Sequence, residues 1–210
     1  MRTPLLHTIN TGHEEFDKEG YLVVRNIWNP KDFYGDMPRD PGTYTYGRTE
    51  LVKVTEEQQV PGSIARYSFP PYRHYHSQIR LKLEKIIGRK LYNTYYYDRF
   101  YSPGMELAKH KDRDACEISF TFHVATNAKE QWPIWIETPY GEDHSCILNP
   151  GDGMVYKGCD CNHWREELPR EYTKTWYGKK VEKEGILYHQ IFFHYVLADG
   201  LRCQFANELR

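Results

Sequence analysis

The sequence predicts a mainly β protein with flanking helices, built on an antiparallel sandwich or barrel. Two observations predict this class. From about residue 91 onward, short strand-like stretches alternate with turn residues, and no helix-length segment separates them. Aromatic residues make up 15% of the chain, including 18 Tyr, and their flat side chains pack well on a pleated surface.

Length and charge limit the organisation and the partners. The 210 residues fit a single domain, residues 1–210. We expect an N-terminal helical and irregular elaboration over residues 1–90 and the β core over residues 91–200. Lys and Arg total 28 against 29 Asp and Glu, so the net charge is −1. Such a balance gives no general attraction to nucleic acid or to an anionic membrane, and neither partner is expected.

The termini and the cysteines indicate a soluble cytoplasmic protein. The first residues lack the apolar stretch of a signal peptide. No apolar run approaches the roughly 20 residues that a membrane span needs. The 5 cysteines cannot all pair within one chain because their number is odd, so reduced thiols are the simpler expectation.

The N-terminal part contains two predicted helices. Residues 13–28 predict a short polar helix, a turn at Gly20 and a strand over 21–27. Residues 30–75 are rich in Pro, Gly, Tyr and Arg without a clear period, which predicts an irregular, partly extended segment. Ser77 is then typical of a helix N-cap, apolar residues follow at helical spacing, and Gly88 ends the helix.

Strands dominate the remainder. Residues 116–125 alternate, with Ser119, Thr121 and His123 on the polar face and Phe120 and Phe122 on the apolar face. The other predicted strands cover residues 95–101, 133–138, 145–148, 154–157 and 189–197. A further strand can follow His163, over residues 164–168.

Three residues form a candidate metal site. His110 and Asp112 are two positions apart, so in extended backbone both side chains point the same way. A Gly-rich turn and a strand precede His163, and a hairpin there delivers its imidazole beside the first pair if the sheet closes as a jelly roll. Two His and one carboxylate on one face of a metal leave open positions for other ligands, as in non-haem iron(II) oxygenases.

The surrounding sequence resembles the 2-oxoglutarate- and Fe(II)-dependent oxygenases. Residues 101–112 (YSPGMELAKHKD) are similar to the prolyl-4-hydroxylase pattern, in which a Tyr and a Pro-Gly turn precede His-x-Asp. Gly151-Asp152 and the later His163 match in order and spacing. Other segments between Phe16 and Gly200 look like a little-characterised bacterial and viral branch of the superfamily. The resemblance implies a double-stranded β-helix (jelly-roll, cupin-like) core, with Fe(II) on His110, Asp112 and His163.

The resemblance also implies contacts to 2-oxoglutarate. Relatives place a basic residue about ten positions beyond the distal His, but here Thr173 stands there, inside a polar insertion over residues 170–185. We therefore favour Arg165, which shares the strand face of His163, together with Gln190 as the anchor of the far carboxylate. Tyr101 and Thr121 complete the expected contacts. Two further candidates for the anchor remain open, His189 and His194.

The implied function is an oxygenase reaction with a substrate that the sequence does not identify. The resemblance implies a dioxygenase that consumes O2 and 2-oxoglutarate, hydroxylates a C–H bond and releases succinate and CO2. A prolyl residue of a protein or peptide is the first expectation for the substrate, and a small molecule is the second. The 170–185 insertion is either a lid over the pocket or a surface excursion.

Four alternatives compete with this interpretation. Cys159, Cys161 and His163 have zinc-like spacing, but no second Cys/His pair accompanies them, so buried structural cysteines are favoured. Cys116 as a nucleophile needs a base such as His123 nearby. A non-catalytic cupin-like metal-binding module shares the three ligands but needs no cosubstrate anchor, whereas a metal-free lectin or capsid jelly roll leaves the ligand pattern unexplained.

Overall fold

Two α-helices and fourteen strands are assigned in the part of the chain that the computed structural model describes, residues 7–35 and 40–208. The helices are α1 (His7–Glu19) and α2 (Arg73–Ile87). The strands are β1 (Tyr21–Val24), β2 (Gly42–Tyr46), β3 (Glu50–Glu57), β4 (Val60–Tyr67), β5 (Leu91–Tyr101), β6 (Leu107–His110), β7 (Ile118–Thr126), β8 (Ile134–Glu137), β9 (Asp143–Cys146), β10 (Gly153–Lys157), β11 (His163–Arg165), β12 (Tyr172–Lys174), β13 (Lys180–Glu182) and β14 (Tyr188–Leu197).

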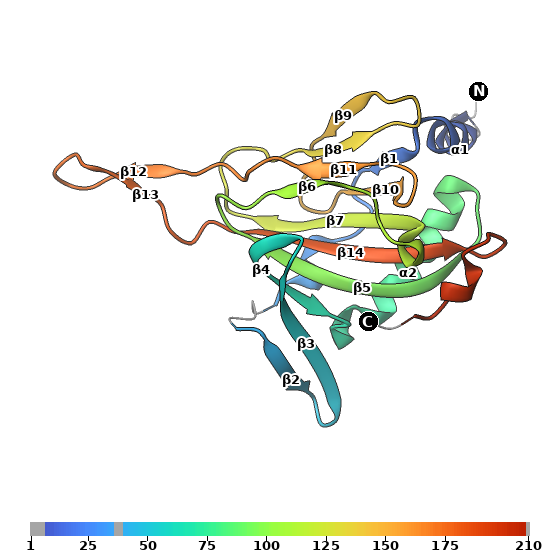
Figure 1. The fold of residues 1–210 in the computed structure, drawn as a ribbon, viewed down its shortest axis with the longest axis horizontal. Coiled ribbons are helices and arrows are strands. Elements are labelled where there is room, and N and C mark those ends of the chain that lie inside the picture. Colours follow the sequence, from blue (N-terminus) through green and yellow to red (C-terminus); the bar gives the residue numbers. More distant parts are fainter. Residues whose placement is uncertain (1–6, 36–39, 209–210) are drawn as a thin grey trace, which may run out of the picture.

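The strands form two facing antiparallel sheets (Figure 1). The large sheet has eight strands in the order β1-β10-β7-β14-β5-β4-β3-β2, and the small sheet has four in the order β6-β11-β8-β9. Strands far apart in sequence are neighbours in both sheets, as in a jelly roll. The predicted mainly β fold with a double-stranded β-helix core is confirmed.

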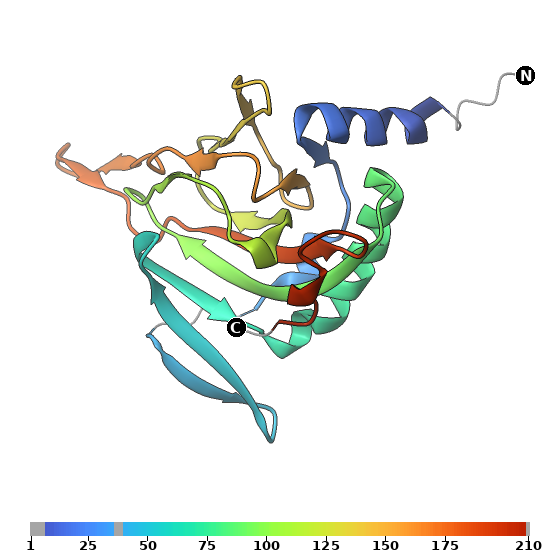
Figure 2. The same ribbon diagram turned by 45° about the vertical axis from the view of Figure 1, so that its right-hand side comes forward.

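The helices cover the face of the large sheet that is turned away from the small sheet (Figure 2). Ile79 and Leu83 of α2 are fully buried there against apolar side chains of β7 and β14. Phe33, in a 3₁₀ turn that precedes the first hairpin, fills the same core and its ring lies 5.0 Å from that of Phe122. This layer buries the apolar face of β7, so the polar face of the same strand is turned toward the small sheet.

The observed β7 agrees with the alternation of its sequence. Phe120 and Phe122 belong to the helix-side core. Ser119, Thr121 and His123 are also buried, but on the opposite face, inside the barrel. Buried polar side chains are expensive unless they are hydrogen-bonded or bind a ligand. The polar face of β7 is therefore the first place to look for a site.

The expectation of an irregular segment over residues 30–75 is wrong for most of its length. Residues 42–67 form β2, β3 and β4, which extend the large sheet beyond β5. The hairpin of β2 and β3 projects from the body of the molecule in Figure 1. Leu51-Val-Lys-Val-Thr55 does alternate in burial, with Val52 and Val54 buried. Frequent Gly, Pro and Tyr around this stretch obscured a real strand period.

The boundaries of α2 differ from the prediction at one end. The helix begins at Arg73, without a side-chain cap, and Ser77 lies within it. The Ser77 hydroxyl instead accepts a hydrogen bond from Asn93 at 3.0 Å. Gly88 ends the helix at φ +65°, as predicted, because a residue without Cβ adopts this left-handed conformation at little cost.

The 170–185 insertion forms a two-stranded arm, β12 and β13, which extends from the body of the molecule at the left of Figure 1. Its tip carries Trp176, which is 96% exposed. None of the helices that the structure describes is long and apolar enough to cross a bilayer.

His76 provides a test of the packing of α2. The residue is buried, and its Nε2–H donates to the His194 carbonyl at 3.0 Å. Burial lowers the pKa of His76 to about 3. An unfolded histidine titrates near 6.5, so stability that is present above this pH is lost as the pH falls toward the folded pKa.

We expect His76→Gln to flatten the dependence of the unfolding free energy on pH. Between pH 7 and pH 4.5, this one group should cost the wild type about 2 to 3 kcal/mol that the variant does not lose. Urea unfolding at both pH values measures the difference. His74→Gln, on the exposed side of α2, is the control. Equal pH dependence in wild type and His76→Gln would contradict the prediction.

Candidate metal centre

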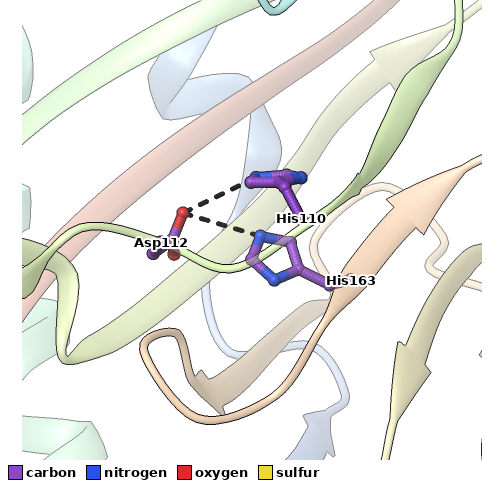
Figure 3. A group of neighbouring side chains, drawn as sticks. All are labelled: His110, Asp112 and His163. Atoms are coloured by element: carbon purple, nitrogen blue, oxygen red, sulfur yellow. Dashed lines mark ion pairs between the residues drawn. The ribbon is translucent and has the colours of Figure 1, made fainter.

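The two candidate histidines lie opposite each other on neighbouring strands of the small sheet. His110 ends β6, His163 begins β11, and the two residues are register partners in the antiparallel pair. Their ring centroids are 4.2 Å apart. Figure 3 shows both rings turned toward Asp112, which follows β6.

Asp112 is held in place through its main chain. Its N–H donates to the Gly158 carbonyl at 2.8 Å, which ties the segment after β6 to the end of β10. Its Oδ1 then lies 3.7 Å from Nε2 of His110 and 3.6 Å from Nε2 of His163. Burial alone would raise the pKa of this carboxyl, but the two imidazoles hold it well below its usual value. The carboxylate is therefore ionised.

Main-chain carbonyls orient both imidazoles. Nδ1 of His110 lies 2.8 Å from the Ala108 carbonyl, and Nδ1 of His163 lies 3.2 Å from the Cys161 carbonyl. A carbonyl only accepts, so in each ring Nδ1 carries a proton, and Nε2 is the atom that can offer its lone pair to a metal beside Asp112. This is the arrangement that metal-binding histidines adopt.

The three side chains fit a metal ion. One donor atom from each residue lies within 4.8 Å of the others. Two imidazoles and one carboxylate, converging from one side, match the donor set of non-haem iron(II) centres. The structure thus brings together all three residues that the sequence predicted as ligands.

Arg165 is a buried cation that has no counter-ion in the part of the chain that the structure describes. It lies two residues after His163 on β11 and is 2% exposed. Its guanidinium donates to the Trp132 carbonyl at 2.6 Å and lies 3.5 Å from the Tyr188 hydroxyl. Among the described residues no carboxylate pairs with it, and its Nε has no hydrogen-bond partner. Burying such a charge is costly unless an anion binds beside it.

The other predicted cosubstrate residues lie in the same interior. The Gln190 amide donates to Thr121 Oγ1, both side chains are fully buried, and Gln190 Oε1 is left without a partner. The Tyr101 ring packs edge-on against Trp132 at 5.0 Å, and the Arg165 guanidinium lies 4.4 Å from the centre of that same indole. We use the name inner chamber for this group of buried side chains.

His123 also belongs to this buried group, although the sequence did not predict it there. It is the register partner of Gln190 and stacks on Tyr188 at 4.1 Å. Burial, reinforced by the nearby Arg165, lowers the pKa of His123 to about 4, so the ring is neutral at pH 7. Its Nδ1–H donates to the Leu148 carbonyl at 2.7 Å, and its Nε2 has no partner among the residues that the structure describes. The alternation of residues 116–125 had already placed His123 on the polar face of this strand, and that position indicated its place in the site.

Two positions considered from the sequence lie elsewhere. His189 contacts Asp98 at 2.9 Å and stacks on Phe100, on the opposite face of β14 from Gln190. Thr173 is exposed on the arm. Neither side chain reaches the inner chamber.

A pocket of about 540 Å³ opens on the other side of the metal centre. Three tyrosines, Tyr67, Tyr95 and Tyr97, form its floor, and Tyr67 stacks on Tyr97 at 4.9 Å. No residue of the 170–185 arm lines it. The remaining lining residues are Lys53, Thr55, Glu56, Glu57, Gln58, Gln59, His110, Lys111, Asp112, Arg113, Cys116 and His194.

The cysteines are free, as expected. Cys161 is buried and its thiol lies 3.9 Å from the Gly20 carbonyl, which agrees with a structural role. Burial raises the pKa of the Cys116 thiol far above its usual value, and the thiol contacts the Tyr95 hydroxyl at 3.2 Å. A thiol so protonated is a poor nucleophile.

The fold and the His/Asp/His group together define a jelly-roll protein with a candidate metal centre. By sequence, no family model and no curated protein matches the chain. Solved structures do match it. A Pseudomonas putida prolyl-4-hydroxylase has a TM-score of 0.57 and 11% identity, over 89% of this chain and 98% of that chain.

Two further solved structures show the same similarity. EctD from S. alaskensis, solved with 2-oxoglutarate and 5-hydroxyectoine, has a TM-score of 0.59 and 11% identity, over 93% of this chain and 78% of that one. A Trichoplax adhaerens prolyl hydroxylase, in complex with a peptide of a hypoxia inducible factor, has a TM-score of 0.55 and 8% identity, over 93% and 94%. The chain has the fold of the 2-oxoglutarate- and iron(II)-dependent oxygenases.

Gly158 tests the placement of Asp112. A Cβ at this position would lie 2.5 Å from Asp112 Oδ2 and 2.3 Å from the Cys116 carbonyl. We expect Gly158→Ala to displace the carboxylate and weaken Mn(II) binding roughly ten-fold or more, as measured by electron paramagnetic resonance titration without oxygen. Gly35→Ala, where an added Cβ meets nothing within 4 Å, is the control. Unchanged affinity in a folded Gly158→Ala protein would refute the assigned position.

Proposed function

We propose that this protein is an Fe(II)- and 2-oxoglutarate-dependent dioxygenase that hydroxylates a C–H bond of its substrate. The observation that carries the proposal is the pairing of two features within one barrel. His110, Asp112 and His163 converge as a metal-binding group, and a buried guanidinium without a counter-ion lies two residues along the same strand. A metal ion would fill the donor group, and a bound dicarboxylate would neutralise the guanidinium.

Each ligand has a defined task in this proposal. His110 and His163 would hold the iron through Nε2, with their Nδ1 protons anchored on carbonyls, and Asp112 would add one negative charge. When bound, iron(II) and 2-oxoglutarate supply the oxidation of a C–H bond by O2, with release of succinate and CO2. The protein contributes the geometry of the ligands and a buried interior that excludes water.

Arg165 would bind the far carboxylate of 2-oxoglutarate. A guanidinium donates to a carboxylate through two parallel hydrogen bonds, and here it lies against Trp132 and Tyr188, 4.4 and 4.9 Å from their ring centres. Gln190, Thr121 and Tyr101 would contribute the neutral contacts. The unpartnered Gln190 Oε1 and Arg165 Nε are atoms that a bound molecule or water can satisfy.

We infer that the substrate enters through the pocket above the tyrosine floor. A prolyl residue of a protein or peptide is the first candidate, since a saturated ring packs well on flat aromatic side chains. The Trichoplax enzyme is bound to a peptide, which supports this order. A small molecule is the second candidate, and EctD was solved with 5-hydroxyectoine.

The first test adds Fe(II) and 2-oxoglutarate to the metal-free protein without oxygen. We expect a weak visible absorption band that requires both additions and is absent in His163→Ala, because that variant lacks one ligand. Metal binding without any effect of 2-oxoglutarate would instead indicate a cupin-like metal-binding module. No metal binding by the wild type would refute the ligand assignment.

Arg165→Gln tests the cosubstrate anchor. Loss of a charge-assisted contact of about 1.5 to 3 kcal/mol should raise the 2-oxoglutarate concentration for half-maximal band intensity roughly ten- to hundred-fold. Metal affinity should be unchanged, because Arg165 is not a ligand. Arg165→Lys keeps the charge and should show an intermediate effect, and the exposed Arg170→Gln is the control. Wild-type affinity for 2-oxoglutarate in a folded Arg165→Gln protein would rule out this anchor.

A further inference from the structure

Ser119 lies between the candidate ligand Asp112 and a histidine of the facing strand. Its Oγ is 2.6 Å from Asp112 Oδ2 and 2.9 Å from Nδ1 of His194. Ser119 and His194 are register partners of β7 and β14, at the centre of the large sheet. The three side chains therefore form a continuous hydrogen-bonded chain that reaches the metal centre from the sheet opposite its histidines.

The direction of each hydrogen bond follows from chemistry. An ionised carboxylate only accepts, so the Ser119 hydroxyl proton points to Asp112 Oδ2. The Ser119 oxygen then accepts from His194, which requires a proton on Nδ1 of that ring. A hydrogen bond to a carboxylate is charge-assisted and about twice as strong as a neutral one.

Rigid neighbours fix both members of the chain. Ser119 is 1% exposed and His194 is 2% exposed. The His194 ring packs on Tyr95 at 4.8 Å, and its carbonyl accepts from His76 of α2 at 3.0 Å. Gly158 leaves the room that Asp112 Oδ2 and Ser119 Oγ occupy, since a Cβ there would lie within 2.9 Å of both. Asp112 therefore meets a hydroxyl donor that is already fixed in place.

We propose that Ser119 and His194 are positioning residues that hold Asp112 as a one-oxygen ligand. The proposal rests on the metal centre of the proposed function. With Oδ2 engaged by Ser119, only Oδ1 faces the two imidazole Nε2 atoms, and both oxygens cannot bind the same metal. This arrangement keeps one more coordination position open for other ligands than a two-oxygen carboxylate would.

A second metal site on the same residues is the competing interpretation. Asp112, Cys116 and His194 also have donor atoms within 4.8 Å of one another. However, the Asp112 Oδ2 and His194 Nδ1 atoms already bond Ser119, so two of the three donors are engaged. The hydrogen-bonded chain accounts for these side chains without a second ion.

Ser119→Ala tests the proposal by Mn(II) titration without oxygen. We expect a ten- to hundred-fold rise in the dissociation constant, the usual effect of removing a residue that orients a ligand. Thr126→Val is the matched control, because it removes a hydroxyl from the other end of β7 that bonds the Leu187 carbonyl. It should lower thermal stability without changing metal affinity.

Two more variants separate positioning from folding. His194→Phe keeps a flat ring on Tyr95 but removes the donor, so it should weaken Mn(II) binding in the same direction as Ser119→Ala. Ser119→Thr keeps the hydroxyl and should restore most of the affinity. The Mn(II) resonance spectrum should also change in Ser119→Ala, because the carboxylate becomes free to bind through both oxygens.

The outcomes distinguish this proposal from the proposed function. If the wild type binds Mn(II) and Ser119→Ala binds it equally tightly with an unchanged spectrum, the positioning role is refuted while the metal centre stands. If binding in Ser119→Ala falls no more than in Thr126→Val, the loss is structural and the proposal is also refuted. If the wild type does not bind Mn(II), the metal centre and the positioning role are both refuted.

Discussion

The antiparallel pairing of β6 with β11 is the constraint on which the site depends. It places His110 opposite His163, and a shift of one residue in either strand would turn one imidazole to the other face of the sheet. Asp112 follows only because its main chain bonds Gly158 at the end of β10. One strand pair and one loop contact thus bring His163 next to His110 and Asp112, so that their donor atoms form one group.

Two other buried charges of the large sheet are paired with an opposite charge within the protein. Arg99 is buried, but it is paired with Glu57 at 3.1 Å and donates to the Tyr101 hydroxyl. On the outer face of the same sheet, Asp98 is paired with Arg66. Of the three arginines Arg66, Arg99 and Arg165, only Arg165 lacks an acidic partner among the described residues. Because the fold neutralises its other buried charges internally, the exception indicates a ligand that arrives from outside.

Sequence reasoning predicted what local periodicity and ligand spacing can encode. The alternation of β7, the glycine that ends α2 and the grouping of the three candidate ligands all follow from residues close together or from chemical type. Ser119 was given no role, His123 was considered only as a base for Cys116 and His194 only as a cosubstrate anchor, because their contacts run between β7 and β14, about 70 residues apart in the chain. The span from β2 to β4 was missed for a different reason, since Gly, Pro and exposed Tyr there resemble a loop composition.

The candidate ligands border two different environments, because His163 shares β11 with the buried Arg165 whereas His110 and Asp112 line the open pocket. Arg165, Thr121 and Gln190 are almost completely buried, whereas the pocket lined by Tyr67, Tyr95 and Tyr97 is open and polar. The candidate ligands reflect this difference, because the His163 side chain is 3% exposed and that of His110 is 22% exposed. In the proposed function, a small dicarboxylate suits the buried side and a larger substrate suits the open side. The proposed oxidation requires both molecules to reach the same metal, and the three candidate ligands are the point that the two sides have in common.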